Sequence, residues 1–416
     1  MNWIAIVILV TLCLHYLIDC IADYLNLSVL SPDIPADFAG VYNAEQYVRA
    51  QEYLRVKTRF NRLVTTFDLA VFLGFWFFHG FEWLDQWVRT MDIVSGSPVM
   101  TGIFYIAVLL GAKALLELPF AIYATFVIEA RFGFNTTTWR TFVTDRLKII
   151  VLAAVIGLPL VSAILWFFEN AGGLAWLWCW AGVSLFMMIM QVVVPAWIMP
   201  LFNKFEPLEA GELKTGVMEY ARTVKFPLTN VFVMDGSKRS AKSNAFFAGF
   251  GQRKRLVLFD TLISNHPVAH IVAVVAHEIG HYKKRHVLWG LILAILQAGV
   301  MFYLLSLFIS YEPLFHAFFV QTPSVYAGLV FFGILFSPIE FFVGLLVLAH
   351  SRHNEYAADR FAAETTGMPD ALADALKKLS VDNLSNLTPH PFYVFLHYSH
   401  PPVKARVDAL GGRLKA

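Results

Sequence analysis

The stretch Ala273-Val-Val-Ala-His277-Glu278-Ile279-Gly280-His281-Tyr282 places two histidines four residues apart in an apolar run. In a helix both imidazoles leave the same face one turn apart, where they can bind one zinc ion at about 2.0–2.1 Å. Glu278, beside the first histidine, can take a proton from a water that the metal activates and later pass it to a leaving amine. The motif predicts a zinc peptidase site with His277 and His281 as metal ligands and Glu278 as general base.

Three matching residues within a pentapeptide also occur by chance, and a catalytic zinc needs a third protein ligand and one open position. The segment Asn354-Glu355-Tyr356-Ala357-Ala358-Asp359 carries two carboxylates one helical turn apart. Alone, such a pair is often a solvated helix face, but the upstream motif favours metal binding. We expect Glu355 to be the third ligand of a single zinc per chain. Asp359 is expected to orient a ligating histidine by accepting a hydrogen bond from its free ring nitrogen.

The composition is that of a membrane protein. The 416 residues are 58% hydrophobic and 15% charged, with a mean hydropathy of +0.60, which is too apolar for a soluble enzyme. The net charge of +2 gives no reason to expect nucleic acid. A helix needs roughly 20 residues to cross a bilayer core, and seven apolar stretches are about that long: residues 3–17, 63–83, 102–127, 149–168, 174–199, 287–309 and 325–348. The first of them is short and is interrupted by His15.

Basic residues gather in alternate loops between these stretches. The first, third and fifth loops contain many lysines and arginines, whereas residues 84–101, 169–173 and 310–324 contain only Arg89. Cytosolic loops carry the excess of Lys and Arg, so the N-terminus is predicted outside and the C-terminus in the cytosol. The histidine motif and Glu355 then share the cytosolic side.

The chain divides into four parts: transmembrane helices in 1–199, a cytosolic protease domain in 200–286, two further transmembrane helices in 287–350, and a cytosolic segment in 351–416 that completes the zinc site. The second part is mixed α/β, with a helix near 211–224 and strands near 231–234 and 256–259. Its basic residues are expected to face solvent or lipid headgroups: Lys238, Arg239 and Arg253-Lys254-Arg255.

Beyond the zinc motif, several short segments resemble the CAAX prenyl protease 1 family of integral-membrane zinc metallopeptidases. They are Gly236-Ser237-Lys238-Arg239-Ser240, Ser243-Asn244-Ala245-Phe246, Leu256-Val257-Leu258-Phe259-Asp260-Thr261-Leu262, Gly133-Phe134-Asn135 and Ser399-His400-Pro401-Pro402. The resemblance implies about seven transmembrane helices that enclose a hydrated chamber, capped by the protease domain. It also implies removal of the last three residues of prenylated CAAX proteins. In a cell without such proteins, clearance of CAAX-like or damaged membrane substrates is expected instead.

The same resemblance implies further site residues. Asn244 and Ala245 would form a strand edge that aligns the peptide substrate by β-augmentation, although the residues alone fit a packed loop equally well. His400, of the His-Pro-Pro element, would donate to the oxyanion or to a substrate carbonyl. Arg406 would support the site through Asp359 or a substrate carboxylate. His286 is expected to be structural.

Charged residues inside the predicted spans leave two alternatives open. Asp68, Glu82, Lys113, Glu117 and Glu340 can pair with one another or line a water-filled interior. They also fit a rival function, a polytopic transporter or channel whose histidines bind metal without peptidase activity. We expect a multi-pass protein of the bacterial cytoplasmic membrane or the endoplasmic reticulum, in contact with lipid and a peptide or protein substrate.

Overall fold

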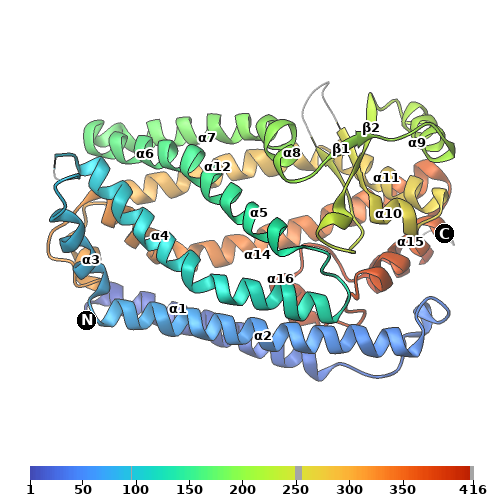
Figure 1. Cartoon of the computed structure of the whole chain (residues 1–416), viewed down its shortest axis with the longest axis horizontal. Helices are drawn as coiled ribbons and strands as arrows, with labels where there is room; N and C mark the ends of the chain where they lie inside the picture. The colour runs from blue at the N-terminus through green and yellow to red at the C-terminus, as the bar shows by residue number, and fades with distance from the viewer. Residues whose placement is uncertain (95, 249–254, 413–416) are drawn as a thin grey trace.

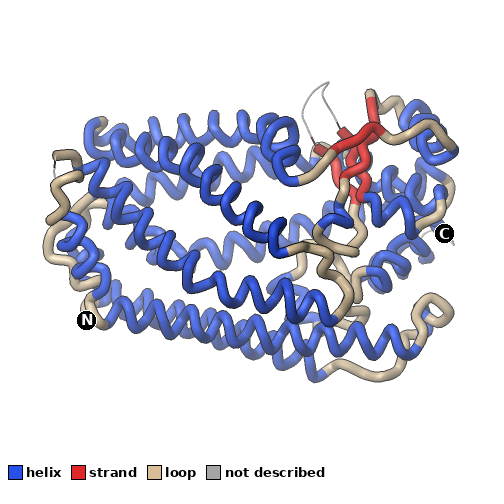
Figure 2. The backbone as a smooth tube through the Cα atoms, viewed as in Figure 1, coloured by secondary structure: helices blue, strands red, loops and turns tan. Residues whose placement is uncertain are grey.

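The computed structural model describes residues 1–94, 96–248 and 255–412. Long helices run side by side along the molecule, and a small sheet with short helices gathers at one end (Figure 1). Figure 2 shows that all described strands lie at this end, opposite the bend between α2 and α3. We call the strand-containing end the cap. Arg253 and Lys254, expected on a headgroup-facing surface, lie outside the described residues.

The helical elements dominate the described chain. The α-helices are α1 Trp3–Ser28, α2 Ala44–Phe77, α3 Gly80–Arg89, α4 Pro98–Tyr123, α5 Trp139–Leu152, α6 Leu158–Asn170, α7 Ala175–Val193, α8 Met199–Phe202, α9 Glu212–Thr223, α10 Asp260–Asn265, α11 Val268–Lys283, α12 His286–Phe308, α13 Glu312–Ala317, α14 Val325–Thr366, α15 Pro369–Asp382, α16 Pro391–His397 and α17 Val403–Gly412. The π-helical turns are Ala124–Glu129, Ala153–Gly157 and Val194–Ile198. The 3₁₀ turns are Ala36–Phe38, Gly172–Leu174 and Gly236–Lys238.

Within the described residues, six helical segments are long and apolar enough to cross a membrane, or seven when α2 and α3 count as one bent span. Two helices end away from the boundaries expected for the first two spans. The helix of the first span does not stop at residue 17 but continues to Ser28. Within it, His15 Nε2 lies 3.6 Å from Asp19 Oδ2, one turn further along. The second ends at Phe77, where His79 takes a positive φ of 60° and the chain bends by 63°. Glu82 therefore lies in α3, beyond the bend, and accepts a hydrogen bond from Gln321 N–H.

The spanning helices are loosely packed over part of their length. Residues 111–116 of α4 are all exposed, as are residues 287–290 of α12. A helix packed on one side buries part of every 3.6-residue turn, so these turns have open space on both sides. Lys113 pairs with Glu117 at 2.8 Å within α4, which supports the pairing alternative for these two residues. The enclosed chamber remains a prediction.

The cap contains a four-stranded sheet in the order β1-β2-β4-β3. Its strands are β1 Phe205–Pro207, β2 Asn230–Met234, β3 Ala245–Ala248 and β4 Arg255–Phe259. β2 and β4 are parallel, whereas β1 and β3 pair antiparallel at the two edges. Buried apolar residues of β2, β4 and α11 pack together in one core, including Val231, Leu256, Leu258, Val275 and Ile279. The sheet therefore supports α11, which carries the histidine motif.

Ion pairs join the cap to the helical bundle. Arg239, expected to face solvent or lipid headgroups, instead binds Asp145 of α5 through Nε at 2.7 Å and Nη2 at 2.9 Å. Lys242 Nζ lies 3.0 Å from Glu129 and 2.9 Å from the Tyr53 hydroxyl of α2. Bidentate arginine–carboxylate pairs have defined geometry, so these contacts fix the orientation of the loop that leads into β3.

Close packing at the other end of α14 makes a first test possible. A Cβ at Gly328 would lie 2.4 Å from the backbone oxygen of Ile309, whereas one at Gly344 meets nothing within 4 Å. Overpacking against backbone costs about 1–3 kcal/mol. We expect Gly328→Ala to lower the thermal unfolding temperature in detergent. Gly344→Ala, on the same helix, should leave it unchanged or slightly raised. Equal melting temperatures for the two variants would contradict the described packing.

Candidate metal centre

The two histidines of the motif and a distant glutamate converge at the cap. His277 and His281 lie one turn apart on α11, and Glu355 lies on α14. The two Nε2 atoms are 3.1 Å apart. Glu355 places Oε2 3.4 Å from His277 Nε2 and Oε1 3.3 Å from His281 Nε2. The structure therefore brings together all three residues predicted as metal ligands.

The spacing of these atoms fits a small tetrahedral cation. Ligand atoms about 2.0–2.1 Å from a tetrahedral ion lie about 3.3–3.4 Å from one another, close to the three observed separations of 3.1–3.4 Å. Glu355 is 3% exposed, and its Oε2 has no hydrogen-bond partner among the described residues. A buried carboxylate oxygen that makes no hydrogen bond is costly, even with the Arg406 guanidinium 3.3 Å away. A cation bound between the three side chains would satisfy it.

A glycine allows the two helices to approach this closely. A Cβ at Gly280 would lie 3.2 Å from both the Cα and the backbone oxygen of Ala358, and 3.1 Å from the Phe361 ring. The glycine of the motif therefore lies directly against the turn of α14 between Glu355 and Asp359. The contact holds the carboxylate of Glu355 within reach of both imidazoles.

Asp359 and Arg406 form a buried pair behind His277. Asp359 Oδ1 lies 2.8 Å from His277 Nδ1, while Arg406 donates to Oδ2 from Nε at 2.7 Å and to Oδ1 from Nη2 at 2.6 Å. Arg406 Nη1 also lies 3.3 Å from Glu355 Oε2. With Nε2 facing the metal position, Nδ1–H of His277 donates to Asp359 and fixes the ring. Arg406 in turn neutralises the carboxylate of Asp359, which is only 3% exposed.

His286 orients the imidazole ring of His281. Its Nδ1 lies 3.0 Å from Nδ1 of His281, so the Nδ1–H of His281 has an acceptor when its Nε2 faces the metal position. The sequence suggested no such role, because residues five apart do not face each other on a continuous helix. Arg285, at a φ of 59°, breaks the helix between them and turns His286 back.

A cavity of about 190 Å³ opens beside the ligands. Its wall includes the proposed base and every predicted substrate-side residue: Glu278, Asn244, Ala245, His400 and Arg406. His400 is accessible, with a side chain 62% exposed and Nε2 3.3 Å from Glu355 Oε1. Burial raises the pKa of Glu278 above its ordinary value, against the lowering effect of His277 and His281. A raised pKa suits a carboxylate that must accept a proton and release it again.

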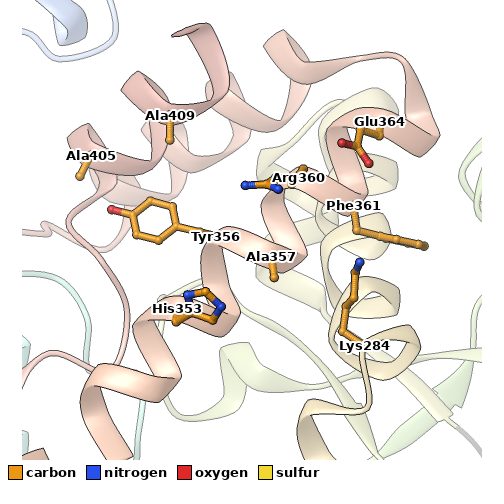
Figure 3. A pocket seen from close by; sticks show the side chains of 9 residues that line it. All are labelled: Lys284, His353, Tyr356, Ala357, Arg360, Phe361, Glu364, Ala405 and Ala409. Carbon is orange, nitrogen blue, oxygen red and sulfur yellow. The ribbon is translucent and has the colours of Figure 1, made fainter. Parts of the chain in front are cut away.

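The opposite face of α14 lines a separate cavity of about 410 Å³ (Figure 3). Tyr356, Arg360 and Glu364 of α14 project there, beside Lys284. Glu355 is not part of that wall, and Asp359 joins Tyr356, Arg360 and Glu364 only in a smaller cavity of about 100 Å³. The two faces therefore separate the metal centre from an accessible charged surface, whose residues serve as controls.

Comparisons with known proteins cover both parts of the chain. Residues 23–204 match the family model described as CAAX prenyl protease N-terminal, five membrane helices. Residues 207–414, which contain the metal centre, match the model of peptidase family M48. The chain belongs to peptidase family M48.

Full-length relatives agree with this M48 assignment. The CAAX prenyl protease 1 homolog of Arabidopsis thaliana is 33% identical over 406 residues, or 96% of each chain. CAAX prenyl protease 1 of Saccharomyces cerevisiae is 32% identical over 395 residues, covering 88% of this chain and 86% of the relative. A crystal structure of S. mikatae Ste24p matches with a TM-score of 0.92 at 30% identity, covering 99% of both chains.

Membership of M48 confirms several expectations. The chain is a polytopic helical membrane protein and a metalloprotease of the CAAX prenyl protease type. It requires a metal and acts on peptide or protein substrates. The comparisons do not support the transporter alternative.

The contact between Asp359 and His277 predicts a loss of metal affinity. Asp359→Asn removes the carboxylate that accepts from His277 Nδ1 and binds Arg406. Loss of such an outer partner lowers metal affinity by about 10–100-fold. Competition with a chelator, followed by metal analysis of the protein, measures this change. Glu364→Gln alters an exposed carboxylate on the other face of α14 and should retain normal affinity. Equal affinities for the two variants would contradict the role of Asp359.

Proposed function

We propose that this M48 protein is a zinc endopeptidase whose single metal is held by His277, His281 and Glu355. The observation that carries the proposal is that the two Nε2 atoms lie 3.1 Å apart and each lies 3.3–3.4 Å from one carboxylate oxygen of Glu355, beside the half-buried Glu278 in a cavity. Two imidazoles and one carboxylate are a common ligand set of catalytic zinc, which keeps a fourth position open.

Bound zinc supplies a water of lowered pKa and polarises the substrate carbonyl. Glu278 accepts the proton of the attacking water and then donates it to the leaving amine. The raised pKa of the Glu278 carboxyl favours this proton transfer. Asp359 and His286 keep both ligating rings in the tautomer that directs Nε2 to the metal. His400 contributes an N–H to the developing oxyanion, and Arg406 acts through Asp359.

We further propose that the substrates are prenylated CAAX proteins, from which the last three residues are removed, or CAAX-like and damaged membrane proteins. The names of the relatives support this class. The cavity supports it too, because one wall is aliphatic and suits the aliphatic residues of a CAAX sequence: Leu262, Val274, Leu372, Leu376 and Leu379. The edge strand β3, which begins at Ala245 directly after Asn244, would align the peptide.

We propose that the cap lies on the cytosolic side of the membrane. The basic loops that predict the cytosolic face contact the cap, as the pairs of Lys242 with Glu129 and Arg239 with Asp145 show. By the positive-inside rule this end of the bundle faces the cytosol. Either the endoplasmic reticulum membrane or a bacterial cytoplasmic membrane accommodates this orientation.

Glu278→Gln tests the catalytic proposal. The amide keeps the shape of the side chain but cannot accept the proton, so we expect cleavage to fall by at least about 100-fold while bound zinc stays at one per chain. The assay uses a farnesylated CAAX peptide and its unmodified twin, with the products weighed by mass spectrometry. The farnesylated peptide should lose three residues faster than its twin.

Glu364→Gln is the matched control and should cleave at the wild-type rate. Normal cleavage by Glu278→Gln would sink the assignment of the base. Equal rates on the two peptides would leave the peptidase assignment standing but remove the preference for a prenyl group.

A further inference from the structure

Arg352 lies on the stripe of α14 that also carries Glu355 and Asp359. The three residues are spaced i, i+3 and i+7, so their side chains leave the same side of the helix. Nη1 of Arg352 donates to the carbonyl of Tyr398 at 2.7 Å and to that of Val394 at 3.3 Å. One guanidinium therefore binds two backbone carbonyls at the end of α16.

This contact fixes the start of the segment that carries His400. Tyr398 is the C-cap of α16, and at its extended backbone the chain leaves the helix and enters residues 398–402, here called the His400 loop. The last carbonyls of a helix have no partners within it, and hydrogen bonds from a charged donor are stronger than neutral ones. Arg352 therefore ties the first residue of the His400 loop to α14.

The other end of the His400 loop is held by the same helix. Arg406 of α17 donates to Asp359 from Nε at 2.7 Å and from Nη2 at 2.6 Å, and its backbone N–H bonds the Pro402 carbonyl at 3.1 Å. The loop is thus attached to α14 on both sides, upstream through Arg352 and downstream through Asp359. Glu355 lies between these two points of attachment on α14.

The backbone of His400 has little freedom between these attachments. His400 follows Tyr398 by two residues, and each residue spans at most about 3.6 Å. Pro401 comes next and is buried, its ring fixes φ near −65°, and a residue that precedes proline is kept out of the helical conformation. The position of the His400 imidazole therefore follows from the position of Tyr398.

Ser399 makes a second contact, with the imidazole itself. Its Oγ lies 2.9 Å from His400 Nδ1, whereas His400 Nε2 lies 3.3 Å from Glu355 Oε1 and so faces the metal centre. A neutral imidazole has one N–H and one acceptor nitrogen. A hydroxyl that donates to Nδ1 leaves the hydrogen on Nε2. This is the tautomer that a donor to the oxyanion needs.

We propose that Arg352 and Ser399 are positioning residues for His400: Arg352 determines where the imidazole lies, and Ser399 determines which nitrogen carries its hydrogen. The proposal rests on the peptidase function and on the role of His400 proposed above. It explains how an imidazole that is 62% exposed can act as a fixed donor. Such fixing matters because a misplacement of about 1 Å can cost about 100-fold in rate.

The first test measures kcat and KM of Arg352→Ala on the farnesylated CAAX peptide by mass spectrometry. An oxyanion donor acts on the transition state more than on the bound substrate, so kcat should fall by about 10–100-fold while KM changes by less than about threefold. Bound zinc should stay at one per chain. Arg352→Lys keeps a charged donor and should recover part of the rate.

Arg360→Ala is the matched control on the same helix. It removes an exposed arginine in the wall of the separate cavity (Figure 3) and should cleave at the wild-type rate.

A double-mutant cycle with His400→Ala separates positioning from general damage. Arg352→Ala should slow wild-type protein by about 10–100-fold but change the rate of the His400→Ala protein by less than about threefold. Ser399→Ala should lower kcat by about 3–10-fold, as expected for one hydrogen bond, and should likewise have no further effect when His400 is absent. Ser399→Thr keeps the hydroxyl and should keep the wild-type kcat.

Each outcome bears on the proposal. Equal losses from Arg352→Ala in the two backgrounds, a loss of zinc, or a change confined to KM would overturn the role of Arg352. An unchanged kcat in Ser399→Ala would overturn that of Ser399. If His400→Ala cleaved at the wild-type rate, the oxyanion donor and this proposal would fall together while Glu278 and the metal ligands stood. If wild-type protein cleaved no peptide, the proposed function itself would fail.

Discussion

The metal centre depends on how closely α11 and α14 approach each other. Gly280 of the histidine motif lies against the backbone of Ala358, so closely that a Cβ there would push the neighbouring atoms back by a few tenths of an ångström. Because of this contact, Glu355 and Asp359 reach His277 from the neighbouring helix, one at Nε2 and the other at Nδ1. A shift of a few tenths of an ångström between the helices would alter the metal and the outer partner together.

The membrane bundle and the metal centre share one helix. α14 has 42 residues, or roughly 63 Å at 1.5 Å per residue, about twice the thickness of a bilayer core. Its first part packs in the far end of the bundle, where Gly328 contacts Ile309, and its last part carries Glu355 and Asp359. The Arg239–Asp145 and Lys242–Glu129 pairs add cross-links between cap and bundle. Because α14 runs unbroken from the bundle to the metal centre, this helix fixes the position of the site at one end of the bundle.

The sequence was most informative where chemistry and helical period coincide. His277, His281, Glu355 and Asp359 were found because residues four apart on a helix share a face. The strands near 231–234 and 256–259 followed from apolar runs. β1 was missed as a strand, and β3 was expected only from the family resemblance, because three or four residues carry too little periodicity to distinguish a strand from a loop.

Other features depend on backbone conformations that hydropathy does not encode. The bend at His79 and the turn at Arg285 both use a positive φ, and they determine where the second span ends and why His286 faces His281. Arg352 and Tyr398 are 46 residues apart, and no motif links them. Their contact emerges only when α14 and the end of α16 are placed in space.

X-ray absorption at the zinc edge of the purified, metal-loaded protein tests the central claim most directly. The account predicts one zinc per chain, with two imidazole nitrogens, one carboxylate and one further light ligand at about 2.0–2.1 Å. The imidazole signal should halve in His281→Ala. Sulfur at about 2.3 Å, six oxygen ligands, or a spectrum unchanged by that substitution would contradict it.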